Sequence, residues 1–325
     1  MSHTGYKNEP YRINGSKPHD YFCINKNKKD MNIVMTGATS GIGAEALKHF
    51  TDSPNTKVYI GARGEGRQAP DKTMLIPLDL SSLKSVRDFA DKVKQQLGTA
   101  KIDILILNAG IRATDNSQKS EEGFELTFAT NHLAHYLLAR LFMPIMSDGA
   151  KLILTTSDAH DPAIIPFGPK KLNIATLADT AKDSPKGMAL YAATKLCNLI
   201  TAYSLAENVA KERTIKIIAY NPGLTGNTSL MGKQSVLMKS VVEILRPLFY
   251  VASVFKPAFF MGTAKRSGEN LAKLALGQII IPTGKIYASL VRGRITFPEP
   301  SKLARDKNTR NLLWKESARM AGLFE

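Results

Sequence analysis

Seven short apolar runs, separated by segments long enough to form helices, constrain the fold of this chain more than any other feature. The runs are rich in Val, Ile, Leu and aromatic residues, which is typical of buried strands. Their nearly continuous hydrophobicity favours parallel strands that helices cover on both faces. The sequence predicts an α/β fold with a doubly wound parallel sheet in the strand order 3-2-1-4-5-6-7. The expected strands are 32–36, 57–62, 73–78, 103–108, 150–156, 215–220 and 284–289.

A glycine-rich turn follows the first expected strand. Gly37, Gly41 and Gly43 all lie between this strand and the next expected helix. Glycine lets the backbone approach a pyrophosphate, and a helix start offers free N–H groups and the positive end of the helix dipole. An ordinary strand-to-helix turn is the alternative, but the strand before and the helix after are the context that dinucleotide binding requires.

The residue after the second expected strand bears on the choice of dinucleotide. An acid at this position usually binds the ribose 2′-hydroxyl of NADH, whereas an arginine accommodates a 2′-phosphate. This chain has Arg63, with Arg67 nearby. Because guanidinium pairs well with phosphate, the sequence favours NADPH (NADP⁺) over NADH. A solvent-exposed loop arginine is the alternative.

Tyr191 and Lys195 lie four residues apart in an expected helix. Residues at this spacing share one face, so the phenol and the ammonium can point into one pocket. A free phenol has a pKa of about 10, and nearby positive charge favours phenolate. We therefore expect a lowered pKa for Tyr191, which would suit it to acid-base catalysis. Cys197, two residues after Lys195, faces away and is expected to be a small buried hydrophobe.

Six motifs occur in the order that is typical of one enzyme family. They are TGATSGIG, LNAG at 107–110, TNHLAHYLL around Asn131, TTSDAH around Ser157, YAATK, and NPG at 221–223. Together they resemble a short-chain dehydrogenase/reductase, which implies a Rossmann fold. The resemblance is close from Met31 to Tyr220 and looser beyond. The retinol dehydrogenase and protochlorophyllide reductase branch is the most similar.

The resemblance implies roles for individual residues. Tyr191 would donate the proton in reduction, Lys195 would tune it and bind the nicotinamide ribose, and Ser157 would stabilise the substrate oxygen. Asn131 would help to build a water relay, although a hydrogen-bonded core asparagine is the alternative. The expected cofactor-binding residues are Gly37, Thr39, Ser40, Gly41, Ile42, Gly43, Arg63, Asp79, Leu80, Asn108, Ala109, Gly110, Tyr191, Lys195, Pro222, Gly223, Leu224 and Thr228. Thr225 is an alternative to Thr228.

Departures from the family pattern limit the prediction of substrate. Leu224 follows NPG where protochlorophyllide reductases carry a cysteine, and they have a longer insert between serine and tyrosine, so light-driven pigment reduction is not expected. The expected function is NADPH-dependent reduction of a hydrophobic ketone or aldehyde. Two alternatives stay open: an NAD(P)-dependent alcohol or retinol-type dehydrogenase running oxidatively, and a non-catalytic dinucleotide-binding scaffold. Replacing Tyr191 by Phe separates the enzyme from the scaffold.

Domain organisation follows from composition along the chain. We expect a polar extension at 1–30 and a single domain at 31–325. Within that domain, an apolar and aromatic segment at 224–262 forms a lid over a lipophilic substrate, and 301–325 forms a helical tail. Charges and prolines interrupt the lid segment, so it is not expected to span a membrane.

Charge and cysteine content bear on location and partners. The net charge is +16, and 16 basic but only 6 acidic residues follow Thr225. These cations could support peripheral membrane contact. No nucleic-acid-binding pattern is present, and a homodimer through the long helices is an option. Two distant cysteines suit the cytoplasm. His132, His135 and His160 lack the spacing of a metal site, so no metal is expected.

Overall fold

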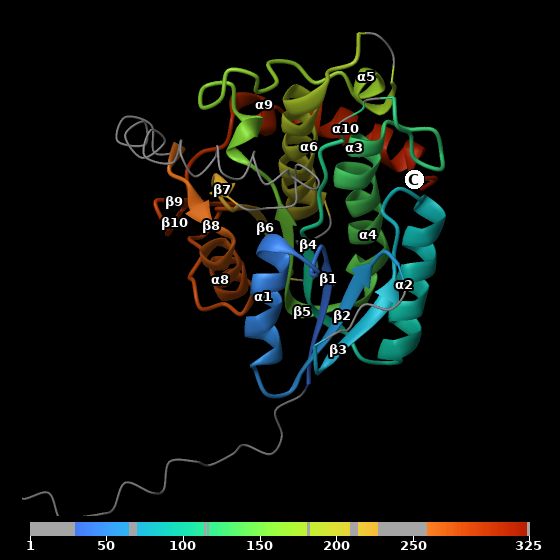
Figure 1. Ribbon diagram of the computed structural model, residues 1–325, viewed down its shortest axis with the longest axis vertical. Helices are drawn as coiled ribbons and strands as arrows, with labels where there is room; N and C mark the ends of the chain where they lie inside the picture. The colour runs from blue at the N-terminus through green and yellow to red at the C-terminus, as the bar shows by residue number, and fades with distance from the viewer. Residues whose placement is uncertain are drawn as a thin grey trace, which may run out of the picture.

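The structure is a computed structural model, which describes residues 30–64, 70–113, 115, 117–180, 183–208, 214–226 and 259–323. Its central feature is an eight-stranded sheet with the order β10-β9-β6-β5-β4-β1-β2-β3 (Figure 1). The strands are β1 (Met31–Thr36), β2 (Thr56–Ala62), β3 (Thr73–Pro77), β4 (Ile102–Leu107), β5 (Met146–Thr155), β6 (Lys216–Asn221), β9 (Tyr287–Val291) and β10 (Arg294–Thr296).

Seven of these strands are parallel and confirm the predicted fold and strand order. The eighth strand, β10, was not predicted. It pairs antiparallel with β9 at the edge of the sheet, as a hairpin that turns at Arg292 and Gly293. A second, two-stranded sheet joins β7 (Thr225–Gly226) to β8 (Gly262–Thr263).

Helices cover both faces of the sheet (Figure 1). One face carries α1 and α8, and the other carries α2, α4 and α6. A π-helical turn, η1 (Ala129–Leu133), directly precedes α4, and a short 3-10 turn, η3 (Asp158–His160), follows β5. The remaining elements are α1 (Gly41–Thr51), α2 (Leu83–Leu97), α3 (Leu126–Phe128), α4 (Ala134–Phe142), η2 (Met143–Ile145), α5 (Ile174–Ala178), α6 (Gly187–Asn208), α8 (Ala264–Ala275), α9 (Lys302–Arg305) and α10 (Lys307–Met320).

The hydrophobic core has two layers because side chains alternate along each strand. In β4, Leu105 and Leu107 pack on the side of α2, α4 and α6, whereas Ile104 and Ile106 pack on the side of α1 and α8. All four are at most 2% exposed. The parallel strands are therefore buried on both faces, as their sequence predicted.

The C-terminal helix α10 packs against α6 and α4. His132 Nε2 hydrogen-bonds Ser317 Oγ at 2.8 Å, and the Trp314 ring meets Tyr136 edge to face at 5.2 Å. The Arg140 guanidinium lies 4.6 Å from the centre of the Trp314 ring. The chain end thus completes the core on this face of the sheet.

Several predicted segments fall outside the described residues. The extension at 1–30 is described only at Asp30, and the lid at 224–262 only at 224–226 and 259–262. The lid and the domain boundaries therefore stay predictions. Among the helices that the structure describes, none combines the length and the apolar character needed to cross a membrane.

Candidate active site

Helix α6 positions the predicted tyrosine and lysine. Lys195 Nζ lies 5.6 Å from the centre of the Tyr191 ring, so the two side chains share one face as their spacing predicted. Both are buried, with Lys195 only 1% exposed. Lys195 Nζ donates a hydrogen bond to Thr155 O at 3.2 Å, which anchors the ammonium at the carboxyl end of β5.

Burial dominates the electrostatics of this pair. It lowers the pKa of Lys195 to about 8. It also raises the pKa of Tyr191 above its usual value, against a side-chain hydrogen bond from Ser157 and the charge of Arg112, which both lower it. The expected lowering of the Tyr191 pKa was therefore wrong, since desolvation of the phenolate outweighs the nearby positive charge.

Three neighbouring hydroxyl groups at the end of β5 have different partners. Thr155 Oγ1 donates to Asn108 Oδ1 at 3.0 Å, and Thr156 Oγ1 donates to Lys195 O at 2.7 Å. Ser157 follows them as the N-cap of η3, where its Oγ accepts from Ala159 N at 3.3 Å. Only Ser157 among the three reaches Tyr191, so the structure brings together the pair that the family pattern selects.

Asn131 lies in the π-helical turn η1 and is fully buried. Its Oδ1 accepts from Ile111 N at 2.8 Å, and its Nδ2 donates to Ile111 O at 2.9 Å and to Thr194 Oγ1 at 3.1 Å. Thr194 belongs to α6, between Tyr191 and Lys195. Asn131 therefore joins the helix that carries the tyrosine and the lysine to the segment after β4.

That segment holds three of the predicted cofactor residues. Asn108 N and Ala109 N donate to Thr36 Oγ1 at 3.0 and 3.2 Å, and Asn108 Nδ2 donates to Gly37 O at 3.2 Å. A Cβ on Gly110 would lie 3.2 Å from Lys195 Nζ. The chain after β4 thus passes directly between the glycine turn and the active-site lysine.

The glycine turn is built so that only glycine fits. Gly37 has a φ of 67°, and a Cβ there would lie 2.7 Å from Ala109 backbone atoms. A Cβ on Gly43 would lie 1.9 Å from Gly37 O. Gly41, with a φ of 56°, faces open space at the first residue of α1. A tight turn that is open at a helix N-terminus suits a pyrophosphate.

The NPG segment follows β6 at the same edge of the sheet. Gly223, with a φ of 69°, donates its N–H to Asn221 Oδ1 at 3.0 Å, and Asn221 Nδ2 donates to Ser289 Oγ at 2.9 Å. Thr225 Oγ1 lies within hydrogen-bond distance of Gly223 O and Ser267 Oγ. Thr225 stays the predicted alternative to Thr228. Thr228 itself is outside the described residues.

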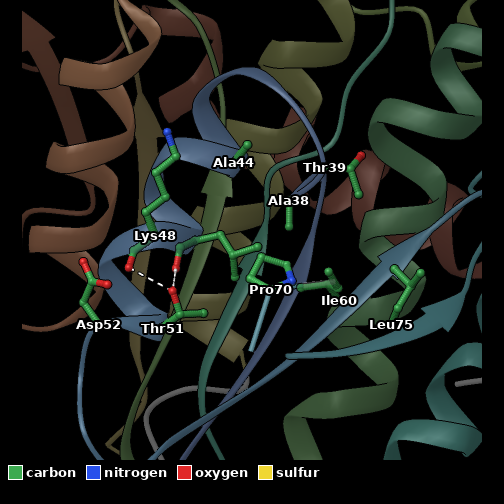
Figure 2. A pocket seen from close by; sticks show the side chains of 10 residues that line it. Ala38, Thr39, Ala44, Lys48, Thr51, Asp52, Ile60, Pro70 and Leu75 are labelled. Atoms are coloured by element: carbon green, nitrogen blue, oxygen red, sulfur yellow. Dashed lines mark hydrogen bonds between the residues drawn. The ribbon is translucent and has the colours of Figure 1, made fainter. Parts of the chain in front are cut away.

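One predicted cofactor residue, Thr39, lines a cavity of about 490 Å³. Arg63 directly follows β2 and is exposed, while Arg67 is outside the described residues. The cavity meets the glycine turn at Thr39 and extends along α1 (Figure 2). Neither Tyr191 nor Ser157 lines it. Its lining residues are Ala38, Thr39, Ala44, Leu47, Lys48, Thr51, Asp52, Ile60, Pro70 and Leu75.

Comparisons with known proteins agree with this geometry. The short chain dehydrogenase family model matches residues 31–165. Human retinol dehydrogenase 12 is 28% identical over 305 residues, which are 90% of this chain and 86% of that protein. Protochlorophyllide reductase of Avena sativa is 26% identical over 322 residues, 90% of this chain and 99% of that protein. The chain is thus similar to short-chain dehydrogenases and reductases over most of its length.

Solved structures share the fold of this chain. The NADPH-bound carbonyl reductase from chicken fatty liver has a TM-score of 0.55 at 17% identity, covering 83% of this chain and 100% of its own. A short chain dehydrogenase of Burkholderia cenocepacia J2315, in complex with NADP, has a TM-score of 0.54 at 21% identity, covering 76% and 91%. At these identities the likeness shows the fold alone.

Several residues that hold the candidate site together were not predicted from the sequence. Thr36 receives the backbone of the NAG segment, and Thr194 contacts Asn131. Asn198 Nδ2 donates to Thr155 O at 3.2 Å, the same carbonyl oxygen that Lys195 contacts. Thr194 and Asn198 lie three and seven residues after Tyr191, and this helical spacing was the available signal.

Among the described residues, the three buried histidines all make hydrogen bonds within the protein. His132 contacts Ser317, His160 Nδ1 contacts Ser157 O at 2.7 Å, and His135 contacts both Thr36 and Asn131. In the part of the chain that the structure describes, no group of three His, Cys, Asp or Glu side chains could hold a metal. Cys197 is buried, which confirms its predicted role in packing.

Proposed function

We propose that this protein is a short-chain dehydrogenase/reductase that uses NADPH to reduce the carbonyl group of a hydrophobic ketone or aldehyde. One observation carries the proposal: the buried Tyr191 hydroxyl, the Ser157 hydroxyl and the Lys195 ammonium meet at the carboxyl end of β5. Ligands of open parallel sheets bind at this edge. Two O–H donors that converge there can both bind the oxygen of one carbonyl group.

The protonation state of Tyr191 bears on the direction that we propose. Reduction requires a phenol that carries its proton, whereas oxidation of an alcohol requires a phenolate. Burial raises the pKa of Tyr191, so the phenol is neutral near pH 7. The proton for the product alcohol is thus already in place, which is what the proposed reduction requires.

The residues present fit a nicotinamide dinucleotide. Such a cofactor, when bound, supplies the hydride. The glycine turn and the start of α1 would bind its pyrophosphate, and Lys195 would bind its nicotinamide ribose with the N–H groups that Thr155 O does not use. Arg63, exposed at the end of β2, supports NADPH because it would pair with a 2′-phosphate.

The substrate class rests on the relatives and on the lid sequence. Retinol dehydrogenase 12 and protochlorophyllide reductase, by their names, act on large apolar molecules. The segment 224–262 of this chain is mostly apolar and aromatic, which suits a lid over such a substrate. Most of that segment is outside the described residues, so the lid stays part of the proposal.

Replacing Tyr191 by Phe tests the catalytic assignment. We expect the variant to lose at least about 100-fold in kcat because the proton donor is gone, while the Kd for NADPH stays within about twofold. NADPH fluorescence titration and turnover of a panel of ketones and aldehydes of graded hydrophobicity measure the two effects. Cys197→Ser, on the opposite side of α6, is the control. Unchanged turnover in the Phe variant would refute Tyr191 as the proton donor, whereas NADPH binding without turnover in the native protein would support the scaffold alternative.

Replacing Arg63 by Asp tests the choice of cofactor. We expect the Kd for NADPH to rise by at least about tenfold, with little change or an improvement for NADH, because a charge-assisted contact to the 2′-phosphate is lost. The same titration with both dinucleotides measures this. Arg294→Asp, at the far edge of the sheet on β10, controls for the change in net charge. Equal loss in both variants, or none in either, would argue against NADPH selection by Arg63.

A further inference from the structure

His135 is a buried titratable side chain for which the proposed reaction has no role. It lies in the first turn of α4 and is completely buried. Its Nδ1 is 3.0 Å from Asn131 O, and its Nε2 is 3.0 Å from Thr36 Oγ1. One ring therefore contacts both the π-helical turn that carries Asn131 and the last residue of β1.

The partners fix which ring nitrogen carries the proton. A backbone carbonyl oxygen only accepts, so Nδ1 must be the donor to Asn131 O. Burial, with a smaller contribution from the charge of Lys195, lowers the pKa of His135 to about 4, so the ring is neutral. In a neutral ring with a proton on Nδ1, Nε2 is an acceptor. The Thr36 hydroxyl is then the donor to Nε2.

With this assignment, the Thr36 hydroxyl uses its one hydrogen as a donor and both of its lone pairs as acceptors. Its hydrogen goes to His135 Nε2, and its two lone pairs accept the N–H groups of Asn108 and Ala109 at 3.0 and 3.2 Å. A proton on Nε2 instead would direct three donors at one oxygen. The neutral ring thus holds Thr36 in the one orientation that receives the chain after β4.

The same helical turn also holds the other end of that segment. Asn131 makes two hydrogen bonds to the backbone of Ile111, at 2.8 and 2.9 Å. The segment 108–111 is therefore fixed at its start through Thr36 and His135, and at its end through Asn131. Between these points Gly110 approaches Lys195 Nζ, and Asn108 contacts Gly37 of the glycine turn.

We propose that His135 is a positioning residue for cofactor binding, acting as a neutral Nδ1-protonated imidazole that orients Thr36 and so fixes the segment 108–111 against the glycine turn. The inference rests on the proposed function, because that segment is assigned to the dinucleotide. His135 touches neither substrate nor cofactor in this role. Its effect reaches the cofactor through the Thr36 hydroxyl.

Two substitutions separate the two hydrogen bonds of the ring. His135→Gln places an amide oxygen near the position of Nε2, so it keeps the acceptor for Thr36, whereas His135→Asn places its amide near Nδ1 and loses that acceptor. Thr36→Val removes the hydroxyl with little change of shape, and Thr36→Ser restores it. His132→Gln is the matched control, since His132 is equally buried one turn earlier but bonds Ser317 on α10.

The binding experiment measures the Kd for NADPH by fluorescence titration, the KM and kcat for NADPH, and the melting temperature of each variant. We expect His135→Asn and Thr36→Val each to raise Kd and KM about tenfold with kcat nearly unchanged, and the double variant to be no weaker than either. His135→Gln and Thr36→Ser should recover most of the affinity. His132→Gln should lower the melting temperature but leave Kd within about twofold.

The inference is overturned if His135→Asn and Thr36→Val lower only the melting temperature, as His132→Gln does. A second measurement needs neither cofactor nor variant: ¹⁵N NMR of the wild-type imidazole should show a proton on Nδ1 and none on Nε2 at pH 7. The opposite tautomer or a doubly protonated ring would also overturn it. Failure of the wild type to bind NADPH would instead refute the proposed function, while the tautomer measurement still tests the network.

Discussion

Lys195 carries an ammonium group in a buried position, and this has a cost for folding. Its pKa is about 8 in the folded protein and about 10.5 when exposed. Between these values the unfolded chain binds more protons than the folded one, so stability from this residue rises with pH across that window and the cost is fully present below pH 8.

Replacing Lys195 by Met should therefore raise the free energy of unfolding most at neutral pH. From pH 7 to pH 11 we expect the native protein to gain about 3 kcal/mol in free energy of unfolding relative to the variant. Urea denaturation at the two pH values measures this, with Lys48→Met, an exposed lysine on α1, as the control. A difference that is independent of pH would show that Lys195 is solvated in the folded state.

These residues also show how much of the candidate site could be predicted from the sequence. The four-residue spacing of Tyr191 and Lys195 predicted their shared face correctly, because helical periodicity is local. The direction of the Tyr191 pKa shift was wrong, because desolvation depends on packing from β5 and η3, which the spacing does not contain. His135 and Thr36 were missed because 99 residues separate them.

The close contact between helices α1 and α8 depends on one glycine. A Cβ on Gly268 of α8 would lie 2.5 Å from Glu45 Cβ and 2.6 Å from Ile42 O, both in α1. The two helices cover one face of the sheet next to the glycine turn. Their distance from one another therefore bears on the position of the first turn of α1.

Replacing Gly268 by Ala should lower the free energy of unfolding by about 2 kcal/mol, since overpacking outweighs the better helix propensity of alanine. Urea denaturation measures this change. Gly262→Ala is the control, because a Cβ there has its nearest neighbour, Leu224 O, at 3.7 Å. That variant should lie within about 0.5 kcal/mol of the native protein. Equal stability of both variants would mean that α8 can shift without cost.

Elements with strong local patterns were predicted, and those set by tertiary contact were not. All seven parallel strands lie where the apolar runs indicated. The π-helical form of η1 was not predicted, since TNHL has no local signal that distinguishes a π turn from an α turn. Strand β10 was also missed because RIT is short and mostly exposed, and its pairing with β9 decides its conformation.

For the whole molecule, buried neutral histidines predict sensitivity to acid. Burial lowers the pKa of His132 to about 3 and that of His135 to about 4, against about 6.5 in an unfolded chain. Below pH 6.5 the unfolded chain takes up protons that the folded protein excludes. Stability is therefore lost as the pH falls, at about 1.4 kcal/mol per pH unit for each histidine.

Between pH 6 and pH 4 the two residues together should remove roughly 3 kcal/mol per pH unit. Urea denaturation followed by circular dichroism across this range measures the slope. The double variant His132→Gln and His135→Gln should have a clearly shallower slope, whatever its stability at pH 7. If both proteins lose stability in parallel, carboxylates rather than these histidines cause the acid sensitivity.

The docking of α10 across α4 and α6 has a consequence for biosynthesis. His132 and its partner Ser317 are 185 residues apart, and Trp314 closes over Tyr136 from the same helix. As the chain leaves the ribosome, the outer sides of α4 and α6 stay uncovered until α10 has been made. A message truncated before the codons of α10 would therefore yield a chain with an open core, a substrate for chaperones and proteases.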